Sequence, residues 1–345
     1  MSKREIGVGL IGLGFMGRTH LAAYRDAARD GSPCRVVALC DASEERFTGT
    51  SEQRGNLERE SDEPLYDPDA VRFTTSFDTL LADPDVDLVS VCTPTDTHVA
   101  LAAQALEAGK HVLVEKPLAL SAAEAEHLAA VAEGSARVCM PAMCMRFWPG
   151  WSWLKERIDA GSYGGVRSAV FRRLGSPPAW SPDFYRDTAR TGGALFDLHV
   201  HDADFVRWCF GDPAQVVTAG HAEHFTTLYR FRAGPPHVSA EAAWDPSPGF
   251  PFRMRYTVVF ERATADYEHG RSPELLLACE GSARAVELPV QTGYDGEVRH
   301  LLDAVAQGAS ELDATLADAL GVARLLVAER RSLAEGGAVS LPAGA

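Results

Sequence analysis

The chain has 345 residues, of which 46% are hydrophobic, and this length and composition favour two domains with a large core. A formal charge of −15 at pH 7 repels phosphate backbones and anionic lipids, so we expect neither a nucleic-acid nor a membrane partner. No apolar stretch reaches about 18 residues and the N-terminus leads directly into a predicted strand, so we expect a cytoplasmic protein.

A glycine-rich turn joins the first predicted strand to the first predicted helix. Gly12, Gly14 and Gly17 have G-x-G-x-x-G spacing and follow an apolar run. Glycines here allow a tight turn, close approach of backbone amides to a pyrophosphate and close packing of helix and strand. The second strand, 36–40, ends at Asp41, where an acidic side chain can accept hydrogen bonds from a ribose. The pattern predicts a dinucleotide site, with an ordinary strand-to-loop turn as the alternative.

Strands and helices alternate over the first part of the chain. Strands are predicted at 6–11, 36–40, 86–92, 111–114 and 137–145, and helices at 97–108 and 121–132. Short apolar strands that alternate with helices are typical of a doubly wound parallel sheet. We therefore predict an α/β Rossmann domain over residues 1–145 that binds NAD.

The pattern changes in the second part of the chain, 146–345, where β-type runs dominate. Strands are predicted at 166–174, 215–222, 226–231, 237–244, 253–261, 274–279 and 283–288, and helices at 151–160, 195–210, 297–307 and 316–333. Closely spaced strands of this kind are typical of a mostly antiparallel sheet. We predict an α+β domain that binds the substrate and mediates oligomerisation.

Lys116 directly follows the short strand 111–114, at the carboxyl end where α/β sheets bind ligands. Pro117 biases the backbone of Lys116 towards an extended conformation, so its side chain is aimed towards the nicotinamide end of a bound cofactor. The alternative is a solvated surface lysine.

A polar motif in the predicted helix 195–210 supplies candidates for proton transfer. Asp197 and His201 are four residues apart and share a helix face, so the carboxylate can hold an imidazole that exchanges a proton with an alcohol. Asp204 lies one further turn along. His199 is on a different face, so it cannot share one metal ion with His201, and we expect no metal site. A structural helix cap or a zinc site are the alternatives.

The order of these motifs resembles that of the glucose-fructose oxidoreductase and inositol dehydrogenase family, Gfo/Idh/MocA. The motifs are the glycine turn, Cys92-Thr93-Pro94 with His98, Glu115-Lys116-Pro117, and Gly192-Gly193 followed by Asp197 and His201. The resemblance covers nearly the whole chain. It implies a Rossmann domain followed by an open-faced, mostly antiparallel sheet, an active site between the domains, and a homodimer or homotetramer.

The resemblance also implies residue roles. Lys116 would stabilise a developing alkoxide, His201 would act as general base or acid, and Asp197 would orient or assist. Besides Lys116 and the three glycines, the family's cofactor contacts fall on Phe15, Met16, Asp41, Thr93, Pro94, His98, Glu115 and Arg146. Residues expected near the substrate are Arg172, Arg173, Trp180 and Tyr185, with solvation of the arginines and packing of the aromatic residues as the alternative.

These features predict an NAD(P)-dependent oxidoreductase that transfers a hydride between the nicotinamide and a secondary alcohol or ketone of a sugar, cyclic polyol or sugar derivative. We expect NAD in preference to NADP, because Asp41 would repel a 2′-phosphate and no arginine follows it immediately. Two alternatives are a non-catalytic NAD-binding regulator on the same scaffold and an NAD-dependent glycoside hydrolase. The acidic stretch 43–69 has no predicted role.

We expect the oligomer to form through the sheet of the second domain, because an antiparallel sheet with helices on one face leaves the other face to be covered. Candidates for that contact face are Val216, Tyr229, Phe231, Val238, Trp244, Tyr256 and Val258.

Overall fold

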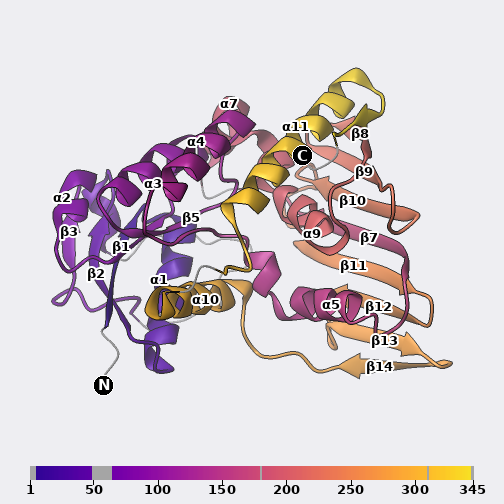
Figure 1. Ribbon diagram of the computed structural model, residues 1–345, viewed down its shortest axis with the longest axis horizontal. Coiled ribbons are helices and arrows are strands. Elements are labelled where there is room, and N and C mark those ends of the chain that lie inside the picture. Colours follow the sequence, from indigo (N-terminus) through magenta and orange to yellow (C-terminus); the bar gives the residue numbers. More distant parts are fainter. Residues whose placement is uncertain (1–4, 49–63, 179–180, 309–310, 343–345) are drawn as a thin grey trace. The chain divides into compact units, whose positions relative to one another are not determined.

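The computed structural model describes residues 5–48, 64–178, 181–308 and 311–342 (Figure 1). The chain divides into two compact units. The first unit comprises Met1–Cys144 with Thr292–Leu320, and the second comprises Met145–Gln291 with Gly321–Ala345. Segment 292–320, which we assigned to the second domain from the sequence, therefore belongs to the first unit, because helix α10 (Gly293–Gln307) packs against helix α1 (Phe15–Arg29).

The first unit is built on a six-stranded parallel sheet in the order β3-β2-β1-β4-β5-β6. The strands are β1 (Ile6–Ile11), β2 (Cys34–Cys40), β3 (Arg72–Thr74), β4 (Leu88–Val91), β5 (His111–Val114) and β6 (Cys139–Pro141). All residues of β1 and β4 are buried, which explains their continuous apolar sequences. The strand order reverses between β1 and β4, and in doubly wound sheets ligands bind beside that reversal. The predicted α/β fold is confirmed.

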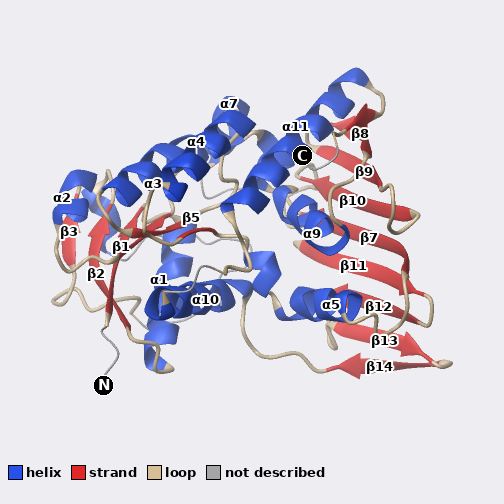
Figure 2. Cartoon of the chain, in the orientation of Figure 1, coloured by secondary structure: helices blue, strands red, loops and turns tan. Residues whose placement is uncertain are grey.

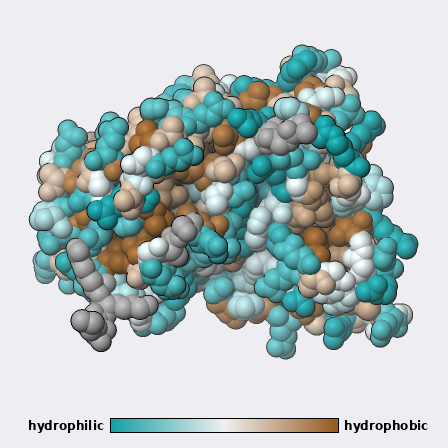
Figure 3. All heavy atoms as spheres, in the orientation of Figure 1, coloured by the Kyte–Doolittle hydropathy of each residue, from teal (hydrophilic) through white to brown (hydrophobic). Residues whose placement is uncertain are grey.

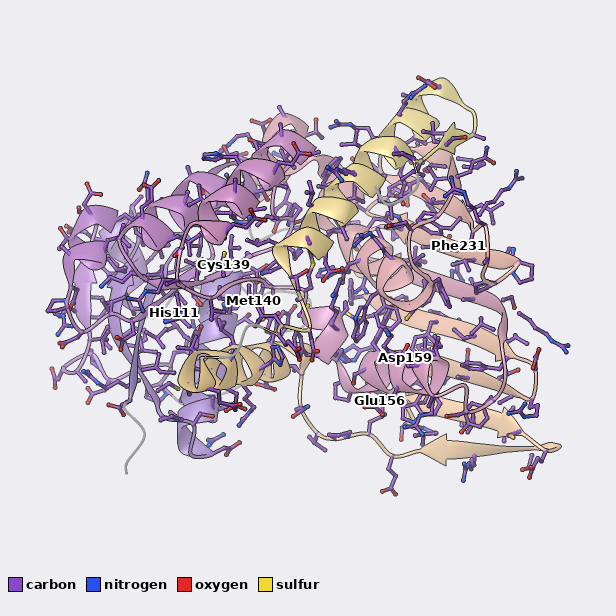
Figure 4. All side chains as sticks on the ribbon, in the orientation of Figure 1. His111, Cys139, Met140, Glu156, Asp159 and Phe231 are labelled. Carbon is purple, nitrogen blue, oxygen red and sulfur yellow. The ribbon has the colours of Figure 1, made fainter. Side chains whose placement is uncertain are left out.

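Helices cover both faces of this sheet, with α3 (His98–Glu107) and α4 (Ala122–Glu133) on one face and α1 and α10 on the other (Figure 2). Two short elements, β3 and α2 (Phe77–Ala82), were not predicted. The predicted strand 137–145 is too long, since β6 ends at Pro141, which has no amide to donate to a neighbouring strand. His111 lies in β5 beside Cys139 and Met140 of β6 (Figure 4), and its Nδ1 accepts the amide of Val138 at 3.0 Å.

The second unit contains a nine-stranded sheet in the order β14-β13-β12-β11-β7-β10-β9-β8-β15. Its strands are β7 (Val166–Leu174), β8 (Gln215–His221), β9 (His224–Arg230), β10 (His237–Ala243), β11 (Arg253–Phe260), β12 (Ala263–Glu268), β13 (Leu275–Cys279), β14 (Ser282–Val286) and β15 (Val339–Ser340). Only β7 and β10 pair in parallel, so the mostly antiparallel sheet is confirmed. Strand β12 was not predicted.

Helices α5 (Pro149–Asp159) and α9 (Val200–Phe210) lie on one face of this sheet (Figure 1). Trp151 of α5 is fully buried, and its ring lies 4.7 Å from that of Phe205 in α9 and 5.7 Å from that of Phe171 in β7, centroid to centroid. Glu156 and Asp159 are on the exposed side of α5 (Figure 4). An aromatic core thus joins these helices to the sheet.

Six of the seven residues expected on the contact face of an oligomer are buried in this core instead. They are Val216, Tyr229, Val238, Trp244, Tyr256 and Val258, each at most 4% exposed, while Phe231 packs against Phe210. Because strand residues alternate between faces, the outer face consists of their neighbours. The prediction that these residues form the contact face of an oligomer was therefore wrong.

The predicted helix 195–210 is also wrong, because two helices replace it: α8 (Gly193–Asp197) and α9. The amide of His199 donates to the carbonyl of Ala194, five residues earlier, at 2.9 Å, and α9 starts after this wider turn. Further helices of the second unit are α6 (Pro182–Arg186), α7 (Thr188–Thr191) and the part of α11 (Leu316–Glu335) from Gly321 onwards.

The visible surface is mainly hydrophilic, with separate hydrophobic patches (Figure 3). Within the described part of the chain, no helix combines the length and the apolar character that a membrane crossing requires. All seven cysteines are free thiols.

Candidate active site

The glycine turn between β1 and α1 is sterically restricted to glycine. Gly12 has a φ of +94°, and a Cβ there would lie 2.6 Å from the carbonyl oxygen of Cys92. A Cβ on Gly17 would lie 1.9 Å from the carbonyl oxygen of Gly12. These contacts join the turn to the end of β4 and to the start of α1, so the turn has the form that a dinucleotide site requires.

The N-terminus of α1 can receive an anion. Its N-cap residue, Gly14, provides no side-chain cap, and the first turn contains no acidic residue. The first amides of this 15-residue helix and the positive end of its dipole therefore suit a pyrophosphate. Phe15 and Met16, the first helical residues, are half-buried at this end.

Asp41 lies beside the turn, at the end of β2. Its Oδ2 accepts the amide of Leu13 at 2.7 Å and its Oδ1 accepts that of Ser43 at 3.0 Å, so the carboxylate has a defined orientation. The 3₁₀ helix η1 (Glu44–Thr48) brings Arg46 back to this point, with its Nε 3.7 Å from Oδ1 of Asp41. Sequence reasoning missed Arg46 because it considered only the residues directly after Asp41.

His98 connects the turns that follow β4 and β5. Its Nε2 lies 2.8 Å from the carbonyl oxygen of Thr93, and its Nδ1 lies 2.9 Å from that of Pro117. Burial lowers the pKa of His98, and this effect outweighs that of the two carbonyl oxygens, which raise it. Because His98 is only 1% exposed, it positions these turns rather than presenting its ring to a ligand.

Lys116 is half-buried at the end of β5, and its amide donates to Oε2 of Glu115 at 3.0 Å. The other oxygen of Glu115 accepts Nε2 of His20 in α1 at 2.9 Å. Burial raises the pKa of Glu115, but the hydrogen bond from His20 and the nearby positive charges outweigh this effect and hold it below its ordinary value. Glu115 is therefore an ionised carboxylate beneath the Lys116 backbone. His20 was not identified from the sequence, because its place in the first helix does not show that it meets Glu115.

Asp197 and His201, in the second unit, are both half-buried, at the end of α8 and in the first turn of α9. They therefore lie on two helices rather than on one helix face, and His199, between them in sequence, is fully buried. Its Nε2 lies 2.8 Å from Oε2 of Glu329 and 3.0 Å from the hydroxyl of Tyr229. Burial lowers the pKa of His199, but Glu329 outweighs burial and raises it overall. His199 therefore belongs to the core.

Arg146 and Arg173 form buried ion pairs within the second unit. Arg146 donates to both oxygens of Asp204, at 2.6 and 3.0 Å, and Arg173 donates to both oxygens of Asp202, at 2.8 and 3.2 Å. Both arginines are at most 3% exposed. Each guanidinium thus has a buried carboxylate partner, and the cofactor contact expected of Arg146 and the substrate contact expected of Arg173 stay predictions.

The other expected substrate residues within the described part of the chain are Arg172 and Tyr185. Arg172 lies on the opposite face of β7 from Arg173 and pairs with Glu241, Nε to Oε2, at 2.5 Å. The two arginines cannot both line one site, because consecutive strand residues point to opposite faces. The ring of Tyr185 packs edge-on against the buried Trp244, at 5.7 Å between centroids. Trp180 lies outside the described residues.

Known proteins match both parts of the chain. Residues 6–143 match a family model described as "Oxidoreductase family, NAD-binding Rossmann fold", and residues 151–264 match one described as "GFO/IDH/MocA C-terminal domain". The chain is 28% identical over 327 residues to inositol 2-dehydrogenase 4 of Saccharopolyspora erythraea, covering 89% of this chain and 88% of that protein. It is 30% identical over 244 residues to myo-inositol 2-dehydrogenase of Thermotoga maritima, covering 66% and 65%.

Solved structures agree on the fold. Levoglucosan dehydrogenase in complex with NADH and levoglucosan has a TM-score of 0.83 at 22% identity, covering 98% of this chain and all of that one. The chain spans about half the length of the first curated relatives it matches.

The glycine turn yields a prediction with a matched control. Gly31, which follows α1, has a φ of +95°, like Gly12, but nothing lies within 4 Å of a Cβ there. We expect Gly31→Ala to lower the free energy of unfolding by about 1–2 kcal/mol through backbone strain alone. Gly12→Ala should lower it further and weaken NADH binding at least about tenfold, because Cβ also displaces the turn from β4. Urea unfolding and NADH fluorescence measure both effects, and equal behaviour of the two variants would contradict the steric argument.

Proposed function

This chain belongs to the Gfo/Idh/MocA oxidoreductase family, and we propose that it is a dehydrogenase or reductase that uses NAD to act on a CH–OH group of a sugar, cyclic polyol or sugar derivative. The observation that carries the proposal is the Glu115–Lys116 turn at the end of β5, in the same unit as the glycine turn. Relatives named as inositol and myo-inositol 2-dehydrogenases support the substrate class.

The proposed cofactor site uses the groups whose geometry suits a dinucleotide. The three glycines and the first amides of α1 would hold the pyrophosphate, and Asp41 would accept the ribose hydroxyls. Phe15, Met16, Thr93 and Pro94 are proposed to line the site, while His98 and Glu115 position its turns. Arg146, whose guanidinium is paired with Asp204, stays a candidate for cofactor contact. Bound nicotinamide supplies or accepts the hydride.

Three side chains are proposed to act on the substrate. The Lys116 ammonium would donate to the reacting oxygen and stabilise negative charge that develops on it. His201 would take the hydroxyl proton during oxidation and return it during reduction, and Asp197 would orient the imidazole or a neighbouring hydroxyl. Arg172, Arg173, Tyr185 and Trp180 stay candidates for substrate contact.

A substitution of Lys116 separates chemistry from cofactor binding. With a panel of polyols, sugars and sugar derivatives assayed by NADH absorbance, Lys116→Met should lower kcat roughly a hundredfold, because a transition-state interaction is lost. The Kd for NADH should stay within about threefold, since the pyrophosphate is held elsewhere. Lys155→Met, which removes a lysine paired with Asp159 on α5, is the control. Full activity of Lys116→Met would refute the proposal, and glycoside cleavage without net NADH formation would favour the hydrolase alternative.

The proposed proton transfer by His201 predicts how the rate of oxidation depends on pH. Oxidation should rise with pH through about 6.5, where an imidazole ordinarily loses its proton, because only the neutral ring can accept the hydroxyl proton. His201→Asn should slow turnover and remove this rise. His237→Asn, an exposed residue at the start of β10, should change neither. His199→Asn is unsuitable as a control, because His199 is buried on Glu329.

Cofactor preference is proposed to depend on Asp41 and Arg46 together. We expect higher kcat/KM with NAD than with NADP, because Asp41 repels a 2′-phosphate. Asp41→Ala should shift the ratio towards NADP by tenfold or more, since it removes the repulsion and also releases Arg46, which lies 3.7 Å away, to bind the phosphate. Adding Arg46→Ala should cancel most of that gain. An unchanged ratio in Asp41→Ala would reject this assignment.

We also propose a homodimer or homotetramer that forms through the outer face of the nine-stranded sheet. This face presents the half-buried apolar side chains of Val170, Val217, Leu228, Val259 and Leu276. Arg172, Arg253, Arg255 and Glu268 line a hollow on the same face, so it offers charges of both signs to a second copy. Light scattering at micromolar concentration should show an oligomer that Val259→Glu dissociates, and a monomeric wild-type protein would contradict the proposal.

A further inference from the structure

A buried polar network adjoins the Glu115–Lys116 turn in the first unit. His20 of α1 is fully buried, and its Nε2 lies 2.9 Å from Oε1 of Glu115 and 3.7 Å from Oε1 of Glu297 in α10. The other oxygen of Glu115 accepts the Lys116 amide at 3.0 Å. One carboxylate therefore joins α1 to the backbone of the proposed catalytic lysine.

Further polar groups lie on the other side of His20. Burial raises the pKa of Tyr24 far above its ordinary value, so its hydroxyl stays protonated, and it lies 2.9 Å from Oγ of Ser90. Oγ of Ser90 and Sγ of Cys92 lie 3.4 and 3.5 Å from Nδ1 of His20. Because a carboxylate only accepts hydrogen bonds, the contact at 2.9 Å between Nε2 of His20 and Glu115 places a proton on Nε2.

Glu297 is the member of this network that none of these hydrogen bonds includes. It is fully buried, and neither of its carboxyl oxygens has a hydrogen-bond partner within the described residues. The titratable groups facing it are Glu115, His20, Tyr24, Cys92 and, on its own helix, Asp295. Burial, Glu115 and Asp295 raise the pKa of Glu297 well above its ordinary value. Burial and the neighbouring carboxylates therefore favour the neutral form of Glu297, while His20 and Lys116 favour the ionised form of Glu115.

We propose that His20 and Glu297 are positioning residues for Lys116 and act through Glu115. His20 holds one oxygen of Glu115, which keeps the other oxygen on the Lys116 amide. Glu297 fills the space beside His20 as a neutral acid, so it does not compete with Glu115 for the Nε2 proton. The inference rests on the proposed catalytic role of Lys116 and extends it to two residues that do not touch the substrate.

A divalent cation is the competing interpretation of this cluster. The ligand atoms of His20, Glu115 and Glu297 lie within 4.8 Å of one another, and no other group of three metal-ligating side chains among the described residues does so. A cation would need the lone pair of Nε2, however, and that nitrogen lies at hydrogen-bond distance, 2.9 Å, from a carboxylate oxygen of Glu115 that can only accept. The geometry therefore favours the hydrogen-bonded network.

Variants of His20 test the proposal. In His20→Gln the side-chain amide reaches the former place of Nε2 and can still donate to Glu115, whereas in His20→Asn it ends near the former Nδ1. We expect His20→Asn to lower kcat at least tenfold while KM and the Kd for NADH change less than threefold. His20→Gln should restore most of kcat. His127→Asn, an exposed residue on α4, is the matched control.

Variants of Glu297 test its protonation. Glu297→Gln keeps the size and the neutral charge and should retain kcat within threefold, whereas Glu297→Lys, which places a positive charge beside His20, should lower kcat at least tenfold. An equally large loss in Glu297→Gln would show that Glu297 acts as a carboxylate and would overturn the proposal. One equivalent of bound metal in the purified protein, lost in Glu297→Gln, would overturn it in favour of the cation.

A spectroscopic readout separates this inference from the proposed function. The chain has only four lysines, so ¹³C-dimethylation gives few NMR signals, and Lys116→Met identifies that of Lys116. His20→Asn should shift this signal and its titration while circular dichroism is unchanged, and His20→Gln should restore both. An unmoved signal would overturn the positioning role even if Lys116→Met abolishes activity, whereas full activity of Lys116→Met would overturn the proposed function itself.

Discussion

The candidate site of the first unit depends on the two hydrogen bonds that the buried Glu115 carboxylate accepts. Removing a carboxylate from water is costly unless its oxygens are bonded, and here each oxygen has a partner, one from α1 and one from the backbone of Lys116. The orientation of the residue after β5 is thereby coupled to the helix that follows the glycine turn. His98 adds a second connection, between the turns after β4 and β5. Buried polar bonds thus add to the apolar packing of Leu13 and Cys92 in holding the turns at this edge of the sheet.

The second unit uses buried charge differently. Around α9, His199, Asp202 and Asp204 each engage a partner from another segment, namely Glu329, Arg173 and Arg146. Breaking such a pair leaves an uncompensated charge in the core, which costs about 3–5 kcal/mol, so these residues hold α9 in one position. Only Asp197 and His201 of the same polar motif are half-buried rather than buried. Most charged residues of this motif therefore stabilise the fold, and Asp197 and His201 are the two that stay candidates for proton transfer.

Much of the site was predictable from the sequence because its signals are local. The glycine spacing, Asp41 after β2 and Lys116 after β5 follow from strand boundaries. What distant partners decide was not predictable. The continuous helix that placed Asp197 and His201 on one face is divided in two, and a sequence does not show that Asp204 and Asp202 lie opposite Arg146 and Arg173. Arg46 was missed because a short 3₁₀ helix folds it back onto Asp41.

The sequence by itself determined the α/β first domain, the mostly antiparallel second sheet and the residue types for dinucleotide binding, since each depends on short-range periodicity and turn chemistry. Only the tertiary structure decided which strand faces enter the core, that α10 joins the first unit, and that His20 and Glu297 meet at Glu115. Residues 20, 115 and 297 are far apart in the chain, and no local pattern couples them. Burial then changes their chemistry, because a carboxyl group without a partner in the core keeps its proton.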